Sequence, residues 1–164
     1  MAVGVHDPFV TAETITAAGC EPVADWRAAL AEYDALSLHL PATPETLGMI
    51  GTAELAAMKP TAMLINAARG GLVDEAALHA ALTGRMAAGG SALDCFATEP
   101  PRPDNPLLQL ANVVLSPHSA ALSAEAAERM GIVAAKNVLA GLRGTLDPAL
   151  VFNREALVRS GHVL

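Results

Sequence analysis

Aromatic residues are scarce in this chain, which has 164 residues but only 3 Phe, 1 Trp and 1 Tyr, and its formal net charge is −7. A surface that binds single-stranded nucleic acid uses aromatic faces to stack bases and positive charge to hold phosphates. An acidic chain instead repels phosphate backbones. The composition therefore argues against nucleic acid as a partner.

Cysteine is also rare, with Cys20 and Cys95 as the two thiols. They lack metal-ligand spacing, so we expect no metal site and two reduced, packed cysteines. No uninterrupted apolar run approaches the roughly 18 residues of a membrane span, and the N-terminal residues lack the regions of a signal peptide. We expect a cytoplasmic protein with no membrane partner.

What the chain does have is small and aliphatic side chains, with a hydrophobic fraction of 52%. Its length suffices for one domain with a real core. Expected strands are residues 2–6, 21–24, 34–40, 62–67, 89–96 and 112–116. Expected helices are residues 11–19, 25–32, 52–58, 74–84 and 123–141. This alternation predicts an α/β fold with a mostly parallel sheet covered on both faces.

Helix starts are marked by residues that cap N-termini, namely Asp25, Thr52, Asp74 and Ser123. Gly19 closes the first helix, and Pro60 ends the helix that begins at Thr52. The Pro-rich segment 98–106 is expected to be a loop.

Polar residues follow five of the expected strands. In chain order they are Asp7, His39, Asn66 with Arg69, Asp94, and His118. Ligands of open parallel sheets bind outside the carboxyl ends of the strands. We therefore expect these residues to gather at one edge and form one site.

Arg69 carries a planar guanidinium that can bind a carboxylate with two hydrogen bonds. Gly70 is expected to let the main chain turn sharply there. The small and apolar neighbours of Arg69 are expected to leave it little contact with solvent. The alternative is an ordinary solvated charge in a loop.

His118 follows the last strand, and a histidine can both give and take a proton near neutral pH. Glu99, on the preceding loop, could hold one tautomer of its ring. The alternatives are a structural histidine and an exposed loop acid. Asp7 could accept the hydroxyls of an adenosine ribose and repel a 2′-phosphate, or it could be a turn residue before Pro8. No catalytic role is expected for the remaining histidines, His6, His39, His79 and His162.

Four ordered motifs carry a family resemblance. They are LHLPATPETLGMI (38–50), INAARGGLVDEAAL (65–78), ALDCFATEP (92–100) and NVVLSPH (112–118). In order and spacing they resemble the cofactor domain of the D-isomer-specific 2-hydroxyacid dehydrogenases, a family that includes phosphoglycerate dehydrogenase and glyoxylate/hydroxypyruvate reductase. The resemblance spans roughly residues 1–155. It implies a Rossmann-like doubly wound parallel sheet and NAD as cofactor.

The resemblance also implies roles for site residues. Arg69 would bind the carboxylate and oxo group of a 2-oxo acid, His118 would donate the proton, and Glu99 would be its partner. Asp94 would hold the nicotinamide carboxamide, and Asp7 the adenosine ribose. Further cofactor-binding positions implied are His39, Pro41, Thr46, Asn66 and Ala67, together with Arg69 and His118. The implied reaction is hydride transfer between NAD(H) and a 2-hydroxy or 2-oxo acid, and the implied assembly is a homodimer.

The sequence departs from the family most at its start, because a strand and a G-x-G-x-x-G phosphate loop are expected before residue 2. We therefore expect a domain over residues 1–144 that is truncated at its N-terminus. Residues 145–164 would be a tail that returns toward an absent substrate domain. The missing strand is the central one of the order 3-2-1-4-5-6, so we expect a gap or an abnormal pairing between strands 2–6 and 34–40. A smaller departure is Ser119 to Ala121, where family members often carry a glycine-containing run after the histidine.

The missing loop has an expected energetic consequence. Two or three charge-assisted hydrogen bonds to pyrophosphate, each worth roughly 1.5–3 kcal/mol, would be lost. Their loss would weaken NAD binding on the order of 10²–10⁴-fold, and we expect the chain alone to turn over little or nothing. The alternative to an enzyme fragment is a catalytically inactive remnant that serves as a nucleotide-binding or dimerisation module.

Overall fold

In a computed structural model of the protein, residues 1–160 are described, and the chain divides into two compact units. The first unit is Met1–Ser119, and the second begins at Ala120. His162 and the end of the expected tail lie outside the described residues. The expected domain boundary at residue 144 stays a prediction.

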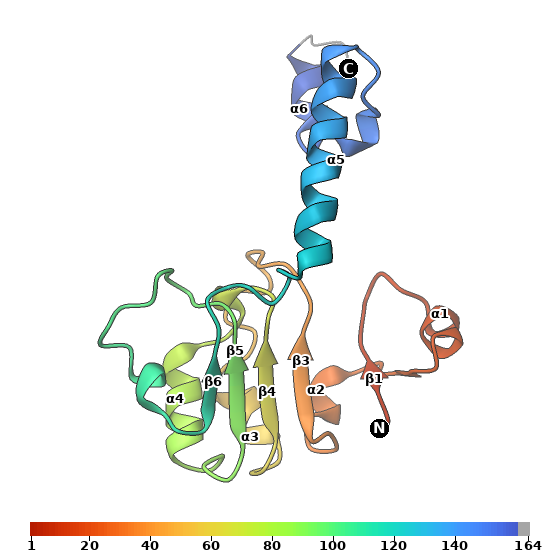
Figure 1. Ribbon diagram of the computed structural model, residues 1–164. Coiled ribbons are helices and arrows are strands. Elements are labelled where there is room, and N and C mark those ends of the chain that lie inside the picture. The colour runs from red at the N-terminus through yellow and green to blue at the C-terminus, as the bar shows by residue number, and fades with distance from the viewer. Residues whose placement is uncertain (161–164) are drawn as a thin grey trace. The chain divides into compact units, whose positions relative to one another are not determined.

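The main sheet of the first unit has four parallel strands in the order β3-β4-β5-β6 (Figure 1). The strands are β3 (Ala35–Leu38), β4 (Met63–Asn66), β5 (Gly90–Leu93) and β6 (Val113–Leu115). Each lies inside an expected strand and is shorter than the apolar run that predicted it. The parallel arrangement confirms the sequence prediction.

Two further strands form a separate parallel pair, β1 (Gly4–Val5) with β2 (Glu21–Pro22). Among residues 1–160, β1 pairs with β2 alone and β3 pairs with β4 alone. The expected gap between strands 2–6 and 34–40 is therefore confirmed. The ring of Tyr33 packs against Gly4, where a Cβ atom would collide with it.

The helices are α1 (Ala12–Ala17), α2 (Trp26–Ala29), α3 (Thr52–Ala57), α4 (Glu75–Thr83), α5 (Ala124–Leu142) and α6 (Arg154–Arg159). Short 3-10 turns lie at Gly70–Leu72, Pro106–Gln109 and Pro148–Leu150. The caps predicted for Asp25, Asp74 and Ser123 are confirmed, because each side chain accepts from backbone N–H groups of the first turn. Asp25 caps a helix shorter than expected, since the chain turns at Leu30, whose side chain is buried in the core.

The cap predicted for Thr52 is wrong, because Gly51 is the N-cap of α3 and Thr52 is its first residue. The side chain of Glu54 takes over the capping role and accepts from the Gly51 N–H at 3.1 Å. An acidic side chain in the first turn can reach back in this way. The sequence favoured Thr52 because a threonine side chain can cap a helix and a glycine has none. In the structure Glu54 supplies the side-chain hydrogen bond, so a glycine can occupy the N-cap.

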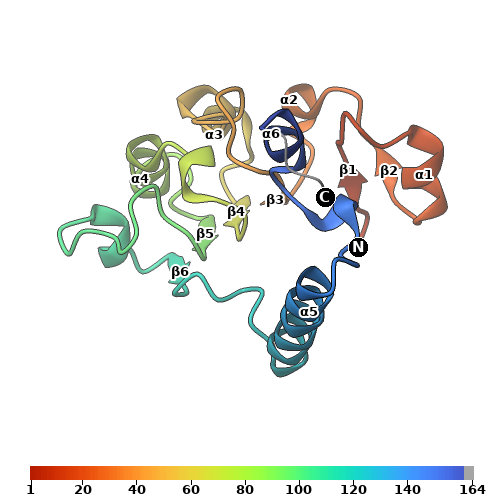
Figure 2. The same cartoon turned by 90° about the horizontal axis from the view of Figure 1, so that it is seen from above.

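Helices α2, α3 and α4 lie on one face of the four-stranded sheet (Figure 2). The core beneath them contains Leu64 and Leu93, which are buried. On the opposite face Met63 is 45% exposed and Val114 is 68% exposed. The expectation that both faces are covered therefore does not hold within residues 1–119. Successive right-handed crossovers that run in one direction along a sheet place their helices on the same side.

No helix among the described residues is both long and apolar enough to span a membrane.

Candidate active site

The carboxyl ends of the four strands of the main sheet are aligned. Leu38 pairs with Asn66, Asn66 with Leu93, and Leu93 with Leu115. The polar residues that lie at or directly after this row are His39, Asn66, Asp94 and Ser116. Four of the five expected strands thus deliver polar groups to one edge, and the prediction is wrong for the first strand, which is not part of this sheet. Asp7 belongs to the separate β1–β2 pair.

The loop that carries Arg69 is built by Asn66, whose side chain is almost completely buried. Its amide nitrogen donates to the Arg69 carbonyl at 2.9 Å, and its amide oxygen accepts from the Ala68 N–H at 3.1 Å. The guanidinium of Arg69 donates to the Ala68 carbonyl at 2.7 Å. Arg69 is exposed, so the expectation that it has little contact with solvent is wrong, because the chain leaves the sheet before this residue.

Gly70 has a different role from the predicted one. Its backbone φ is not positive, unlike the φ angles of Gly19, Gly48 and Gly144, which lie in the left-handed region. A Cβ atom on Gly70 would instead collide with the Phe96 carbonyl and the Ala97 nitrogen. Glycine is needed here because two loops approach closely, and the contact brings the Arg69 loop against the segment that leads to Glu99.

Glu99 and His118 form an ion pair that the sequence predicted. His118 Nδ1 lies 2.8 Å from Glu99 Oε2, and the Phe96 N–H donates to Glu99 Oε1 at 2.9 Å. The hydrogen bond from His118 holds the pKa of the Glu99 carboxyl below its usual range, with a further contribution from the Phe96 N–H. A carboxylate only accepts, so Nδ1 of His118 carries a proton and Nε2 is the nitrogen that can exchange one with a substrate.

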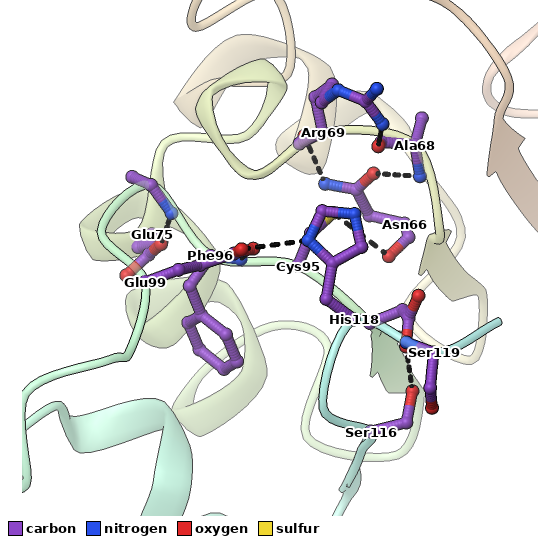
Figure 3. Close-up of polar contacts among 12 residues, drawn as sticks. Asn66, Ala68, Arg69, Glu75, Cys95, Phe96, Glu99, Ser116, His118 and Ser119 are labelled. Atoms are coloured by element: carbon purple, nitrogen blue, oxygen red, sulfur yellow. Dashed lines mark hydrogen bonds and ion pairs between the residues drawn. The ribbon is translucent and has the colours of Figure 1, made fainter. Parts of the chain in front are cut away.

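His118 and Glu99 are both open to solvent, with side chains 46% and 38% exposed. Figure 3 shows Arg69, Asn66, His118 and Glu99 at the same end of the sheet. Arg69 therefore lies at the same end of the sheet as the Glu99–His118 pair, and the roles of the three residues toward a substrate stay predictions.

The backbone of His118 is unusual, because its φ is 53° and it is not a glycine. This left-handed conformation costs an L-residue roughly 1–2 kcal/mol. Asp94 supports the turn, since its Oδ1 accepts from the Ser116 hydroxyl and from the Ser119 N–H, the latter at 2.7 Å. Asp94 is itself buried.

Cys95 lies next to this site but is not suited to nucleophilic chemistry. Its thiol is buried and donates to the Asn66 carbonyl at 3.7 Å. Burial raises the pKa of the Cys95 thiol, and the carboxylates of Glu99 and Asp94 raise it further. A neutral thiol is a poor nucleophile. Cys20 and Cys95 are both free, as expected.

The remaining predicted cofactor residues lie on the surface or near it. Asp7 is exposed, and its carboxylate accepts from the Phe9 N–H at 2.8 Å. His39 is exposed and forms a 2.8 Å hydrogen bond with Ser37. Thr46 donates to the Pro41 carbonyl at 2.8 Å. Ala67 is exposed beside these loops. The roles of these residues toward a cofactor stay predictions.

Sequence reasoning missed Glu75, which supports the loop that carries Glu99. Its carboxylate accepts from the Ala97 N–H at 2.7 Å and from the Asn105 side chain at 2.8 Å. In the sequence Glu75 follows the capping residue Asp74, so it is indistinguishable from an acid that favours a helix N-terminus. Its partners lie 22 and 30 residues further along the chain.

This arrangement combines an exposed cation with a proton donor whose tautomer is held by a carboxylate. Such a site can hold a small anion through Arg69 and move a proton to or from it through His118. An α/β sheet with this site at its carboxyl edge belongs to the Rossmann-like class of dehydrogenase domains.

Residues 1–120 match the family described as D-isomer specific 2-hydroxyacid dehydrogenase, NAD binding domain. The chain belongs to this family. The D-3-phosphoglycerate dehydrogenase of Archaeoglobus fulgidus is 44% identical over 145 residues, which cover 88% of this chain and 27% of that enzyme. The glyoxylate reductase of Korarchaeum cryptofilum is 48% identical over 130 residues, which cover 79% of this chain and 39% of that enzyme.

Solved structures show the same fold. The TT0316 protein of Thermus thermophilus has a TM-score of 0.80 and 38% identity, over 90% of this chain and 45% of that one. The D-lactate dehydrogenase of Lactobacillus jensenii, solved with NAD⁺, has a TM-score of 0.76 and 32% identity, over 87% of this chain and 46% of that one. The chain thus spans less than half the length of these relatives.

Proposed function

We propose that this chain is the cofactor-binding part of an NAD-dependent oxidoreductase that interconverts a D-2-hydroxy acid and its 2-oxo acid. The observation that carries the proposal is the convergence of Arg69 with the Glu99–His118 pair at the carboxyl edge of the sheet (Figure 3). The names of the relatives, phosphoglycerate dehydrogenase and glyoxylate reductase, agree in substrate class.

The residues present fit an NAD molecule in the chemistry of their donor set. The exposed carboxylate of Asp7 suits the hydroxyls of a ribose and disfavours a 2′-phosphate. The segment of His39, Pro41 and Thr46 lies at the end of β3 and would line the cofactor. When bound, NAD supplies the hydride chemistry.

In this proposal Arg69 holds the substrate carboxylate and polarises the neighbouring oxo group. His118 gives a proton from Nε2 to the oxygen that becomes the hydroxyl, and takes it back in the reverse direction. Glu99 keeps Nδ1 protonated and so keeps Nε2 directed toward substrate. Asn66 is buried with its amide engaged in its own loop, so we assign it to shaping that loop.

NMR mapping tests the proposal even if binding is weak. NADH added to the labelled chain should shift amide signals next to Asp7 and in residues 39–46, 66–69 and 94–118, while α4 signals near Ala80 stay unchanged. Oxamate, an isostere of a 2-oxo acid, should then shift signals of Arg69 and His118 only when NADH is present. Arg69→Ala should abolish the oxamate response and keep the NADH response, and Arg129→Ala on α5 is the matched control.

Shifts that fall outside these loops, or an oxamate response that survives Arg69→Ala, would contradict the proposal. Asp7→Ala should reduce the preference for NADH over NADPH in the same titration. Equal selectivity in the two proteins would remove Asp7 from the ribose role.

A homodimeric state and a cytoplasmic location complete the proposal. Exposed apolar side chains on α5, including Met130 and Val133, support self-association. The free thiols of Cys20 and Cys95 support a reducing compartment.

A further inference from the structure

We infer that Asp94 positions the proposed proton donor, because it clamps both ends of the turn that carries His118. The inference rests on the proposed function and adds a positioning residue to it. Asp94 is one of three buried polar residues among residues 1–160, with Asn66 and Ser91. Burying a carboxylate costs free energy of folding unless hydrogen bonds compensate for the lost water. The groups that bond to Asp94 therefore indicate what it does in the structure.

The contacts of Asp94 lie on either side of His118 in the chain. Oδ1 accepts from the Ser116 hydroxyl, two residues before His118, and from the Ser119 N–H, one residue after it. The Asp94 N–H in turn donates to the Asn66 carbonyl at 2.9 Å, which ties Asp94 to β4. The turn is therefore fastened to the centre of the sheet.

The clamp explains how His118 keeps a conformation that L-residues disfavour. With φ at 53°, the residue would relax toward the ordinary right-handed or extended regions if the turn were released. Such a change would rotate the imidazole away from Glu99 and break the 2.8 Å contact between Nδ1 and Oε2. Asp94 thus acts on Glu99 through His118.

The resemblance to the family implied that Asp94 holds the nicotinamide carboxamide. In this structure its Oδ1 serves the turn. A contact between Asp94 and the cofactor would add to these hydrogen bonds. The experiment therefore uses protein without nucleotide, so that only the effect of Asp94 on the turn is measured.

The readout is the titration of the Glu99 carboxyl carbon by NMR. His118→Gln provides the reference, since removing the imidazole should raise the pKa of Glu99 toward that of an ordinary glutamate. Asp94→Ala should also raise it, because the released turn carries His118 away, but by less than His118→Gln, because the repulsion from the Asp94 charge is lost as well. Asp94→Asn should not raise it, because the amide oxygen can still accept both hydrogen bonds.

The sign of the shift separates this effect from simple loss of charge. The Asp94 carboxylate itself raises the pKa of Glu99 by repulsion, so removing its charge alone would lower that pKa. A rise in Asp94→Ala together with no rise in Asp94→Asn therefore reports the clamp. Ser116→Ala removes the hydroxyl donor without touching the buried carboxylate and should give a smaller rise, whereas Ser116→Thr keeps a hydroxyl and should give none.

An unchanged or lowered Glu99 pKa in both Asp94→Ala and Ser116→Ala would overturn the inference. If Asp94→Ala does not fold, the pair Ser116→Ala and Ser116→Thr decides the question. Failure of the proposed function is separate: NADH and oxamate would then not shift the expected loops, while the Glu99 titrations would still show the clamp.

Discussion

Single buried polar residues carry much of the site. Asn66, Ser91 and Asp94 are the buried polar residues of the described chain, and no buried side-chain polar atom within it lacks a hydrogen-bond partner. Ser91 donates to the Leu64 carbonyl at 2.8 Å and so braces neighbouring strands. Asn66 and Asp94 brace the loops of Arg69 and His118. Exposed residues with proposed chemical roles therefore depend on buried ones that never need to touch substrate.

Asn66→Ala should destabilise the first unit by about 1–3 kcal/mol, because the partly buried Ala68 N–H and Arg69 carbonyl lose the side chain that bonds to both. Asn112→Ala is a control, since its side chain donates over 3.3 and 3.5 Å from a half-buried position and should cost less. Urea unfolding followed by the fluorescence of Trp26 measures both. Equal losses would show that Asn66 has no special structural role.

At the scale of secondary-structure elements, the site loops are positioned by contacts between loops as well as by the strands that they follow. The 3-10 turn Gly70–Leu72 lies against the segment after β5, and this contact brings two site loops together. Glu75 in the first turn of α4 holds that same segment through the Ala97 N–H. Helix α4 therefore contributes to the site through its N-terminus as well as to the core through Leu78 and Leu82.

Gly70→Ala should lower the melting temperature, because its Cβ would meet backbone atoms of Phe96 that cannot rotate away; overpacking of this kind costs typically about 1–3 kcal/mol. Gly131→Ala in α5 is the opposite case, since a Cβ there meets nothing within 4 Å. It should stabilise the helix by roughly 0.5–1 kcal/mol. Thermal unfolding followed by circular dichroism compares the two, and shifts of the same sign would contradict this account.

The whole first unit consists of a well-packed sheet and a weakly supported pair of strands. Strands β4 and β5 are each paired on two sides, and Leu64 and Leu93 are buried in the core. The pair β1–β2 has two residues in each strand and packs Tyr33 against Gly4. A lone two-stranded pair is at best marginally stable.

Hydrogen exchange should therefore differ strongly within the first unit. Amides of β4 and β5 should exchange only through global opening, whereas those of β1 and β2 should exchange through local opening at much lower free energy. Exchange followed residue by residue measures this difference. Comparable protection of the two sets would show that β1–β2 is an integral part of the main fold.

The amino-acid sequence by itself determined the alternation of strands and helices, the caps at Asp25, Asp74 and Ser123, and the set of residues at the sheet edge. Caps and apolar periodicity depend on neighbours within about four residues, and parallel strands align their carboxyl ends. The gap beside β3 also followed from the sequence, through the resemblance to a known family.

Only the tertiary structure decided the close approach at Gly70, the support by Glu75 and the left-handed turn at His118. Each depends on groups far apart in the chain, which the register of the sheet brings within hydrogen-bond or van der Waals distance. Gly51 is the N-cap of α3 in place of Thr52, and the Glu54 side chain bonds to its N–H. Arg69 is exposed because the chain has left the sheet before it. Sequence patterns encode local preference, whereas contacts between distant loops arise from packing.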